Sequence, residues 1–565
     1  KCRFQPGNPS QCQACIDHGK ACTFDRPMRK RVARLGRPSG SPQTVDDGSP
    51  SSSSASRQGG DALNQPANTI ENSVPSVLGE VWKPDTLPGQ AIVMDLTEIY
   101  FEVVYPVFPF FHRPMLLRNV ARGEYATSRP LFAAVMALCA LSSARVRDGA
   151  LYTDRWDRSP LQNPSCEYFL KAAADAIPSN APLSQEFDYM RAYALLAITS
   201  IQLGDPRKMN YYLCLYHGFT AVGSLHDERN WPQGIGFVEV ELRRRLFWSI
   251  YTLDVFSSII WGGVVKSRES CYRVTYPTEC NDEAFSDTIA PLAPGEGGEA
   301  SWLKGWNFVT DLYRFLEHTV DSLGHVRNST RQTPPATHTI EGSGLTNSRV
   351  ITNVMALYDQ LPPIFKDIQP ITGNLNTDLF GFQAANIAAS LQLVRMSVFA
   401  TEHSTVFEKC EIANEVIEGF ARVPVAYLRA ISTPLLHHLA GIGTIMGSAF
   451  EDGLTESSYQ RVRTVLMDLA NLLANLEVGL FAKAGTSDKL RGQVSRIDEF
   501  MEVQRSMDAV DKALGTVAQQ GDQSPSLDHP SGSARSARLL DEESSPQIYF
   551  PADLFEDWPW IFEVT

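Results

Sequence analysis

The amino-acid sequence predicts an all-α protein built around one large helical body. Between about residues 81 and 515, apolar side chains recur mostly at intervals of three or four positions, the period of a helix with one buried face. Runs that alternate between apolar and polar residues, as half-buried strands do, are nearly absent. Apolar residues make up 43% of the 565 positions and charged residues 20%, so the chain can fill a sizeable core.

The strongest helical signal lies near the C-terminal end of this body. A single aliphatic stripe predicts a helix of about five turns. Its members are Val462, Val465, Leu466, Leu469, Leu472, Leu473, Leu476 and Leu480. Helices are also expected over 131–144, 187–203, 238–261, 303–323, 380–399 and 425–446. The polar stretches 281–301 and 325–348 are predicted to be long surface loops.

The most apolar long run, 246–265, raises the alternative of a membrane span. Asp254 lies near its centre, and an unpaired aspartate there would cost about 2.5–3.5 kcal/mol on membrane-insertion scales. A buried core helix is therefore favoured, and no membrane is expected among the partners. Arginines at 243–245 precede the run, and we expect at least one of them to pair with Asp254 or Glu241.

Charge is distributed unevenly along the chain. The net charge of −14 excludes a uniformly basic coat that binds nucleic acid. Residues 1–38 nevertheless hold nine Lys and Arg against two Asp, a local balance of +7, so the rest of the chain carries −21. This asymmetry indicates one end that meets a polyanion and a body that does not.

Two polar segments flank the helical body. Residues 39–80 are rich in Ser, Gly, Pro, Asp and Asn, a composition that buries too little surface to order itself, which predicts a disordered linker. Residues 516–565 are predicted to be a disordered tail that is acidic and aromatic at its end. No sustained heptad follows the basic segment, so the sequence does not support a coiled-coil dimer there.

The ten cysteines fall into two groups. Six are scattered through the body and are expected to be reduced, mostly buried thiols: Cys139, Cys166, Cys214, Cys271, Cys280 and Cys410. The other four, Cys2, Cys12, Cys15 and Cys22, include a C-x2-C and stand beside a basic stretch. Thiolates at such spacing can grip a zinc ion, and we favour this reading over the alternative of disulfides.

These N-terminal residues resemble the second half of a fungal Zn2Cys6 binuclear cluster. The matching features are Lys1-Cys2, a proline-containing loop, Cys12-x2-Cys15, Gly19-Lys20 and Cys22-Thr23-Phe24. In the family, two C-x2-C-x6-C halves bind two zinc ions, and Cys2, Cys12, Cys15 and Cys22 match the third to sixth cysteines. The first C-x2-C and most of the first helix have no counterpart here, and we expect them in the full gene product or in an ancestor. The four cysteines present would hold one zinc with four thiolates.

The resemblance also implies how this segment would meet DNA. In the family, the lysine just before the third cysteine contacts bases of a CGG triplet in the major groove, and Lys1 falls at that place. The remaining expected contacts to DNA come from basic residues of the same segment: Arg3, Lys20, Arg29, Lys30, Arg31 and Arg34. Of these, the last four would contact phosphates or serve nuclear import. Double-stranded DNA and a nuclear location are therefore expected.

The helical body resembles the fungal-specific transcription factor domain. The stretches that match are 96–101, 105–114, 130–140 and the Arg243-Arg-Arg-Leu-Phe-Trp-Ser-Ile-Tyr-Thr-Leu-Asp254 run, followed by Pro277 and Asp282. The similarity covers about residues 96–320 and weakens beyond. One departure is Gly223-Ser224-Leu225-His226, where the family usually has Leu-Gly-Leu-His, so the local turn is in question.

The last 25 residues carry seven acids, six aromatics and no Lys or Arg. Such segments fit disordered activation regions, in which a coactivator groove would bury Leu554, Phe555, Trp558 and Phe562. The alternative is that the tail packs back on the helical body and closes its core. The sequence alone gives these two readings equal weight.

Taken together, these patterns predict a regulator of transcription and not an enzyme. Zinc-protease, serine-hydrolase, Walker and dinucleotide-binding motifs are all missing from the sequence. The resemblance implies sequence-specific regulation of RNA polymerase II genes at CGG-type sites, with zinc as cofactor. Coactivators, a homodimer and a small-molecule effector are the further partners considered. The alternative is a regulatory protein that does not bind DNA and keeps only the helical domain, which binds a partner factor or a metabolite.

Overall fold

The computed structural model describes most of the helical body. The described residues are 82–519, apart from 185, 262–263, 291–299, 329–346, 400–404, 432–438, 440–445, 447, 451–452 and 479–484, together with 547–551 and 554. Residues 1–77 and 78–565 form separate units. Within the described ranges the chain is helical, and strand-like pairing is limited to three isolated bridges. The predicted all-α class is therefore confirmed.

Helix α4 (Arg129–Arg147) lies at the centre of the N-terminal half of this body. It is rich in Ala and Leu, which have high helix propensity. Pro130 suits the first turn of a helix, and the positive charges of Arg145 and Arg147 suit the last turn. Helices α2 (Gln90–Ile99), α6 (Cys166–Ala176) and α8 (Phe187–Gln202) pack around it. It passes a length-and-hydropathy test for a membrane span, but 83% of its most apolar window is buried inside the protein.

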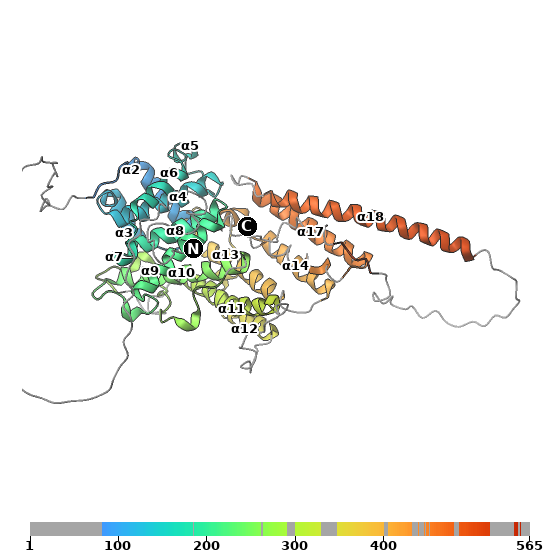
Figure 1. Ribbon diagram of the computed structural model, residues 1–565. Coiled ribbons are helices and arrows are strands. Elements are labelled where there is room, and N and C mark those ends of the chain that lie inside the picture. Colours follow the sequence, from blue (N-terminus) through green and yellow to red (C-terminus); the bar gives the residue numbers. More distant parts are fainter. Residues whose placement is uncertain are drawn as a thin grey trace, which may run out of the picture. The chain divides into compact units, whose positions relative to one another are not determined.

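Helices α9 (Pro206–Gly223), α10 (Phe237–Trp261), α11 (Leu303–Asn328) and α13 (Leu375–Phe399) follow in the chain. Figure 1 shows α8, α9 and α10 grouped on one side of α13, and α11 packs against both α10 and α13. Helix α9 is followed by Ser224 as its C-cap, whose φ of +50° is left-handed. This serine stands where the resembled family has glycine, the residue that adopts such a conformation without steric cost. Ser224 therefore adopts a conformation that a glycine would adopt at lower steric cost.

The remaining elements are shorter or lie outside this group. The helices are α3 (Arg113–Ala121), α5 (Arg158–Leu161), α7 (Ala181–Ser184), α12 (Asn347–Asp359) and α15 (Val425–Ile431). The 3-10 turns are η2 (Glu124–Ala126), η3 (Glu228–Asn230), η4 (Glu269–Cys271), η5 (Asp282–Ala284), η7 (Pro363–Phe365) and η8 (Ser448–Phe450). The π-helical turn η1 (Tyr100–Val104) continues α2.

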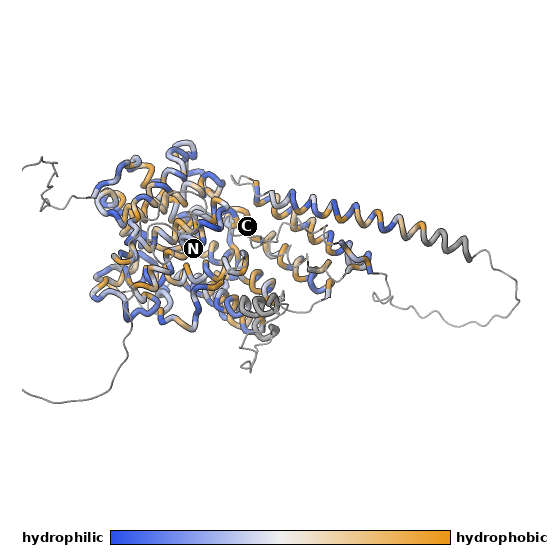
Figure 2. Tube along the Cα trace, viewed as in Figure 1, coloured by the Kyte–Doolittle hydropathy of each residue, from blue (hydrophilic) through white to orange (hydrophobic). Residues whose placement is uncertain are grey.

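The C-terminal part of the body contains α14 (Val406–Ala421), α17 (Glu456–Glu477) and α18 (Thr486–Gln519). A capping box between Thr405 and Glu408 begins α14, and the Thr455 side chain caps α17. Helices α17 and α18 run side by side (Figure 1), and hydrophobic and hydrophilic residues alternate along their tubes in Figure 2.

The predicted helices agree with these elements. Helices α4, α8, α10, α11 and α13 cover the ranges expected for them. The aliphatic stripe is buried along α17 except for Leu472, which is half-buried, and Leu480, which lies outside the described residues. The expected helix over 425–446 is described only through Ile431 and at two isolated positions. The stretch 281–301 is only partly a surface loop, because Asp282 and Phe285 are buried.

Candidate functional sites in the helical body

The residues predicted to hold zinc and to contact DNA lie in 1–81, outside the described residues. They are Lys1, Cys2, Arg3, Cys12, Cys15, Lys20, Cys22, Arg29, Lys30, Arg31 and Arg34. Of the predicted coactivator contacts, Phe555, Trp558 and Phe562 also lie outside, whereas Leu554 is described. All six cysteines of the body are free thiols, and four of them are buried. The candidate sites whose side chains the structure describes therefore lie in the helical body.

A buried ion pair joins α10 to the turn η5. The Arg245 guanidinium donates from Nη1 to Asp282 Oδ1 at 2.7 Å, and the two side chains are 0% and 3% exposed. The Tyr105 hydroxyl donates to Asp282 Oδ2 at 2.6 Å, and the Arg113 backbone N–H donates to the same oxygen at 2.8 Å. His112 Nε2 lies 2.7 Å from the Asp282 carbonyl oxygen. Asp282 thus joins its own turn to two segments that are far from it in the sequence, 105–113 and α10.

The surroundings keep both partners of this pair charged. Burial by itself raises the pKa of Asp282, but the Arg245 charge and the Tyr105 hydroxyl outweigh it and hold that pKa below its ordinary value. Burial lowers the pKa of Arg245, and the Asp282 charge more than reverses the effect. The folded state therefore contains an ionised carboxylate with several hydrogen bonds, which is the arrangement that makes a buried charge tolerable.

The neighbouring arginine Arg244 forms a second, less buried cluster. Its guanidinium contacts Glu228 at 2.9 Å and Glu241 at 2.8 Å. Glu241 also accepts hydrogen bonds from the Thr278 backbone N–H and hydroxyl. The expected pairing of an arginine with Glu241 is thus confirmed, and it ties α10 to the segment that follows it.

Asp254, the other predicted partner, pairs with different groups. Its carboxylate accepts hydrogen bonds from the Lys266 and Ser267 backbone N–H groups at 2.6 and 2.9 Å, and Lys266 Nζ lies 3.1 Å away. His217 Nε2 is 3.8 Å from it. Burial raises the pKa of Asp254, while His217 and Lys266 lower it to a net value below the ordinary one. The chain doubles back after α10 and supplies Lys266 and Ser267, and His217 comes from α9, so an arginine is not needed.

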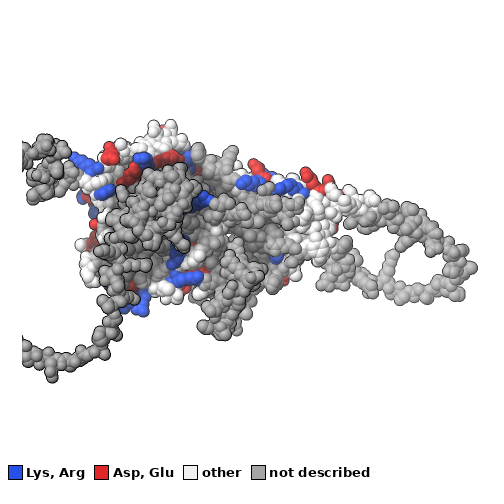
Figure 3. Space-filling model, in the orientation of Figure 1, with Lys and Arg blue, Asp and Glu red and all other residues white. Residues whose placement is uncertain are grey.

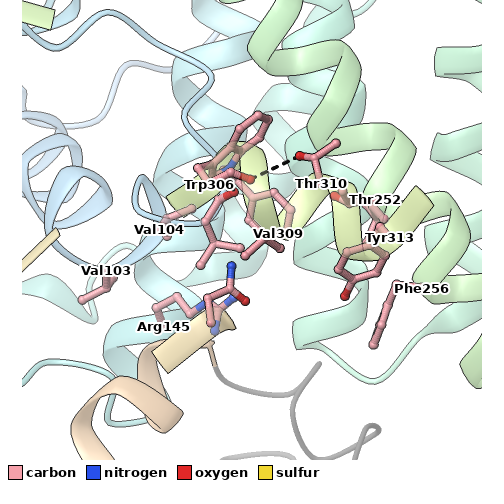
Figure 4. Close-up of a pocket in the computed structure, with 13 residues that line it drawn as sticks. Val103, Val104, Arg145, Thr252, Phe256, Trp306, Val309, Thr310 and Tyr313 are labelled. Carbon is pink, nitrogen blue, oxygen red and sulfur yellow. Dashed lines mark hydrogen bonds between the residues drawn. The ribbon is translucent and has the colours of Figure 1, made fainter. Parts of the chain in front are cut away.

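A cavity of about 60 Å³ lies where η1, α4, α10, α11 and α13 meet. Figure 4 shows side chains from these elements around one space, with Arg145 from α4 opposite Trp306 and Tyr313 of α11. Most of the wall is aliphatic or aromatic, including Val103 and Val104 of the π-helical turn. Turns of this kind are frequent at functional sites. The sequence alone did not predict this cavity. The one feature that pointed to it was an arginine, Arg145, in the last turn of an apolar helix.

The segment 547–551 packs against the C-terminal helices. Ile548 and Leu454 exchange two backbone hydrogen bonds of 2.9 and 3.0 Å as an isolated antiparallel bridge. The Phe550 ring lies 5.1 Å from that of Phe450 and 5.5 Å from that of Phe500, centroid to centroid. Gln493 of α18 donates a hydrogen bond to the Leu554 carbonyl oxygen. The packing alternative is therefore correct for this part of the tail.

The exposed charges of the described body are mixed in sign. On the face seen in Figure 3, basic and acidic side chains of the described residues are interspersed, without a broad basic patch. Many of them pair with each other, as Arg113 does with Glu283 and Arg463 with Asp498.

Comparison with known proteins gives the body a family context. Residues 97–360 match the family described as "Fungal specific transcription factor domain", which begins where the resemblance was expected and extends beyond residue 320. The chain is 21% identical over 320 residues to "Activator of stress genes 1" of Saccharomyces cerevisiae. It is 23% identical over 204 residues to "Transcriptional activator protein acu-15" of Neurospora crassa.

These similarities cover parts of each chain. The aligned regions span 55% and 35% of this chain, but only 31% and 20% of the two relatives. Residues 97–360 are thus similar to the fungal-specific transcription factor domain, and this match together with the similarity to fungal transcriptional activators supports a fungal transcription factor.

Proposed function

We propose that this chain is a nuclear, sequence-specific regulator of RNA polymerase II genes that binds CGG-type sites. The observation that carries the proposal is the match of residues 97–360 to the fungal-specific transcription factor domain. The basic segment 1–38 supports it, because its +7 balance suits a polyanion while the body is acidic. In this proposal Lys1, Arg3 and Lys20 contact the DNA near the triplet, and Arg29, Lys30, Arg31 and Arg34 contact phosphates.

Zinc is proposed as the cofactor of the basic segment. The donors Cys2, Cys12, Cys15 and Cys22 are thiols, the ligands zinc prefers in structural sites. They would hold the metal, which supplies folding free energy to a segment too short and polar to fold by itself. The six-thiolate cluster of the resembled family needs two further cysteines beyond these four.

The helical body and the tail are proposed to regulate and to recruit. Buried ion pairs such as Arg245–Asp282 join elements of the body that are far apart in the sequence. Coactivators are the proposed partners of the tail, through Leu554, Phe555, Trp558 and Phe562. A homodimer and a small-molecule effector complete the proposed partners.

A reporter gene driven by CGG-containing sites tests this proposal in fungal cells. The chain, expressed from its complete coding sequence, is expected to change reporter output at least tenfold. The Cys12→Ser/Cys15→Ser variant should abolish the change, because it removes two zinc ligands. Cys214→Ser is the matched control, since Cys214 is an exposed thiol of the body, and it should leave output unchanged. Equal output from the wild type and the Cys12/Cys15 variant would contradict the proposal.

The second candidate function is a regulatory protein that does not bind DNA and works through its helical domain. The observation that favours it is that the family match, residues 97–360, falls within the acidic body and does not include the basic segment 1–38. Such a protein would alter the output of a partner factor without occupying CGG sites itself. Chromatin immunoprecipitation that finds it at promoters only when the partner is present would support this function over the first.

A further inference from the structure

The cavity among η1, α4, α10, α11 and α13 has the features of a binding site. It is enclosed mainly by apolar side chains, with a few polar groups turned toward it, as sites for small molecules usually are. Three of these polar groups come from different helices: Arg145 of α4, Tyr313 of α11 and Asn386 of α13. Within the described residues, neither the Tyr313 hydroxyl nor the Asn386 amide forms a hydrogen bond with the protein. Both groups are thus available to a ligand.

The charge of the lining favours an anion. Arg145 is 2% exposed, and no Asp or Glu is among the described residues that line the cavity, so this part of the lining carries one positive charge. Burial lowers the pKa of Arg145 to about 10, in spite of the nearby Asp148 carboxylate, so the guanidinium remains protonated at neutral pH. In an interior of low dielectric, such a charge attracts an anion far more strongly than an exposed arginine does. A guanidinium also matches the geometry of a carboxylate, which it can bind through two parallel hydrogen bonds.

The size and the walls of the cavity restrict the rest of the ligand. A volume near 60 Å³ holds about four to six water-sized groups, since one water needs roughly 10–15 Å³ in this measure. Part of the wall is aliphatic and suits a hydrocarbon chain; it is formed by Val103, Val104 and Val309. Further polar groups on the ligand would find no hydrogen-bond partner against these side chains. A ligand with one charged end and a short apolar chain therefore fits both the charge and the volume.

We propose that this cavity binds a short-chain aliphatic monocarboxylate, with the carboxylate on Arg145 and its hydrocarbon chain against Val103, Val104 and Val309. The Tyr313 hydroxyl and the Asn386 amide supply further hydrogen bonds to the carboxylate. The site rests on the cavity itself, and only its role as an effector site depends on the proposed function. Thr252 and Phe256 also line the cavity, and they flank Asp254 on α10. A ligand in the cavity would therefore contact the helix that carries Asp254.

Isothermal titration calorimetry of the full chain with straight-chain carboxylates from acetate to hexanoate tests the site. We expect the best affinity at propionate or butyrate, of about five or six non-hydrogen atoms, and a loss at hexanoate. Ligands this small reach affinities no tighter than about micromolar. Butyrate should bind at least tenfold more tightly than butyramide, which has the same shape and no charge. A series without binding, or equal affinities for butyrate and butyramide, would overturn the proposal.

Two variants locate the binding. Arg145→Gln should bring the butyrate-to-butyramide ratio close to one, whereas Arg118→Gln, which changes an exposed arginine of α3, should leave it unchanged. Because a buried arginine can be needed for folding, Val309→Leu offers an independent measure. It adds one methylene to the wall and should move the preferred carboxylate to a chain about one carbon shorter. An unaltered ratio in Arg145→Gln, or an unaltered length preference in Val309→Leu, would place the site elsewhere and overturn the proposal.

The same preparation separates this inference from the proposed function. Carboxylate binding is measured without DNA, and binding to a CGG duplex is measured without carboxylate. A protein that binds the duplex but no carboxylate contradicts only the cavity site. A protein that binds butyrate but no duplex supports the cavity site and contradicts only the DNA-binding function.

Discussion

Replacing Asp282 with asparagine is expected to lower the free energy of unfolding by about 3–5 kcal/mol, the cost of leaving a buried charge without its partner. The variant keeps the shape of the side chain but removes its negative charge, so Arg245, which is 0% exposed, loses its counter-ion. Equilibrium urea denaturation followed by far-ultraviolet circular dichroism measures the effect. This expected loss is a large share of the total stability of an ordinary domain.

The adjacent residue provides a matched control. Glu283 pairs with Arg113 at 3.4 Å, but the two side chains are 53% and 38% exposed. Glu283→Gln should therefore cost less than about 1 kcal/mol, as surface ion pairs do. A loss below about 1 kcal/mol in Asp282→Asn as well would contradict the structural importance of the Arg245–Asp282 pair.

The pH dependence of this effect follows from the lowered pKa of Asp282. A carboxyl group with a lower pKa in the folded than in the unfolded state stabilises the fold at every pH above its unfolded value, about 3.9. That stabilisation falls as the pH drops from there toward the folded pKa. The difference between wild type and Asp282→Asn should accordingly shrink below about pH 4.

Replacing Phe550 with alanine is expected to lower the free energy of unfolding by about 2 kcal/mol, since the half-buried ring loses its apolar contacts. The ring packs against Phe450, Tyr459 and Phe500, so its removal should also loosen the bridge between Ile548 and Leu454. Urea denaturation of the full chain gives the stability, and the CGG reporter gives the activation.

Tyr549 serves as the control for Phe550, because it is the neighbouring aromatic residue and is 68% exposed. Tyr549→Ala should change stability by less than about 0.5 kcal/mol, the range for surface substitutions. Loss of reporter activation in Phe550→Ala with unchanged stability would contradict packing and would favour coactivator recruitment by this residue. Deletion of 541–565 should likewise lower the melting temperature, because it removes the docked segment together with the rest of the tail.

Helices with one buried face were the most predictable part of the fold. The stripe on α17 follows the helical period, so local spacing alone identifies it. Helix α10 was predicted from its apolar run, and its interior aspartate is buried, as expected for a core helix. The stretch 281–301 was harder, because a polar composition does not reveal that one of its acids is buried against an arginine on another helix.

Partners that depend on the path of the chain were not predictable. Glu241 and Asp254 were predicted to form ion pairs. The backbone donors to Asp254, however, are Lys266 and Ser267, which reach it because the chain reverses direction after α10, and local sequence patterns do not predict that reversal. The cavity needs five elements to converge, and one arginine at the end of α4 is too weak a signal to show it. The composition of the tail suits both an activation region and a segment packed on the body, so the sequence did not decide between them. The contact that favours packing joins Ile548 to Leu454, which is distant in the sequence.

Binding of the purified protein, expressed from its complete coding sequence, to a CGG-containing duplex tests the central claim most directly. The account predicts that a scrambled duplex binds at least a hundredfold more weakly and that a zinc chelator abolishes specific binding until zinc is restored. With four to seven phosphate contacts, the logarithm of affinity should fall against the logarithm of salt concentration with a slope of about −4 to −6. Binding indifferent to sequence and to zinc, or no binding, would contradict the account.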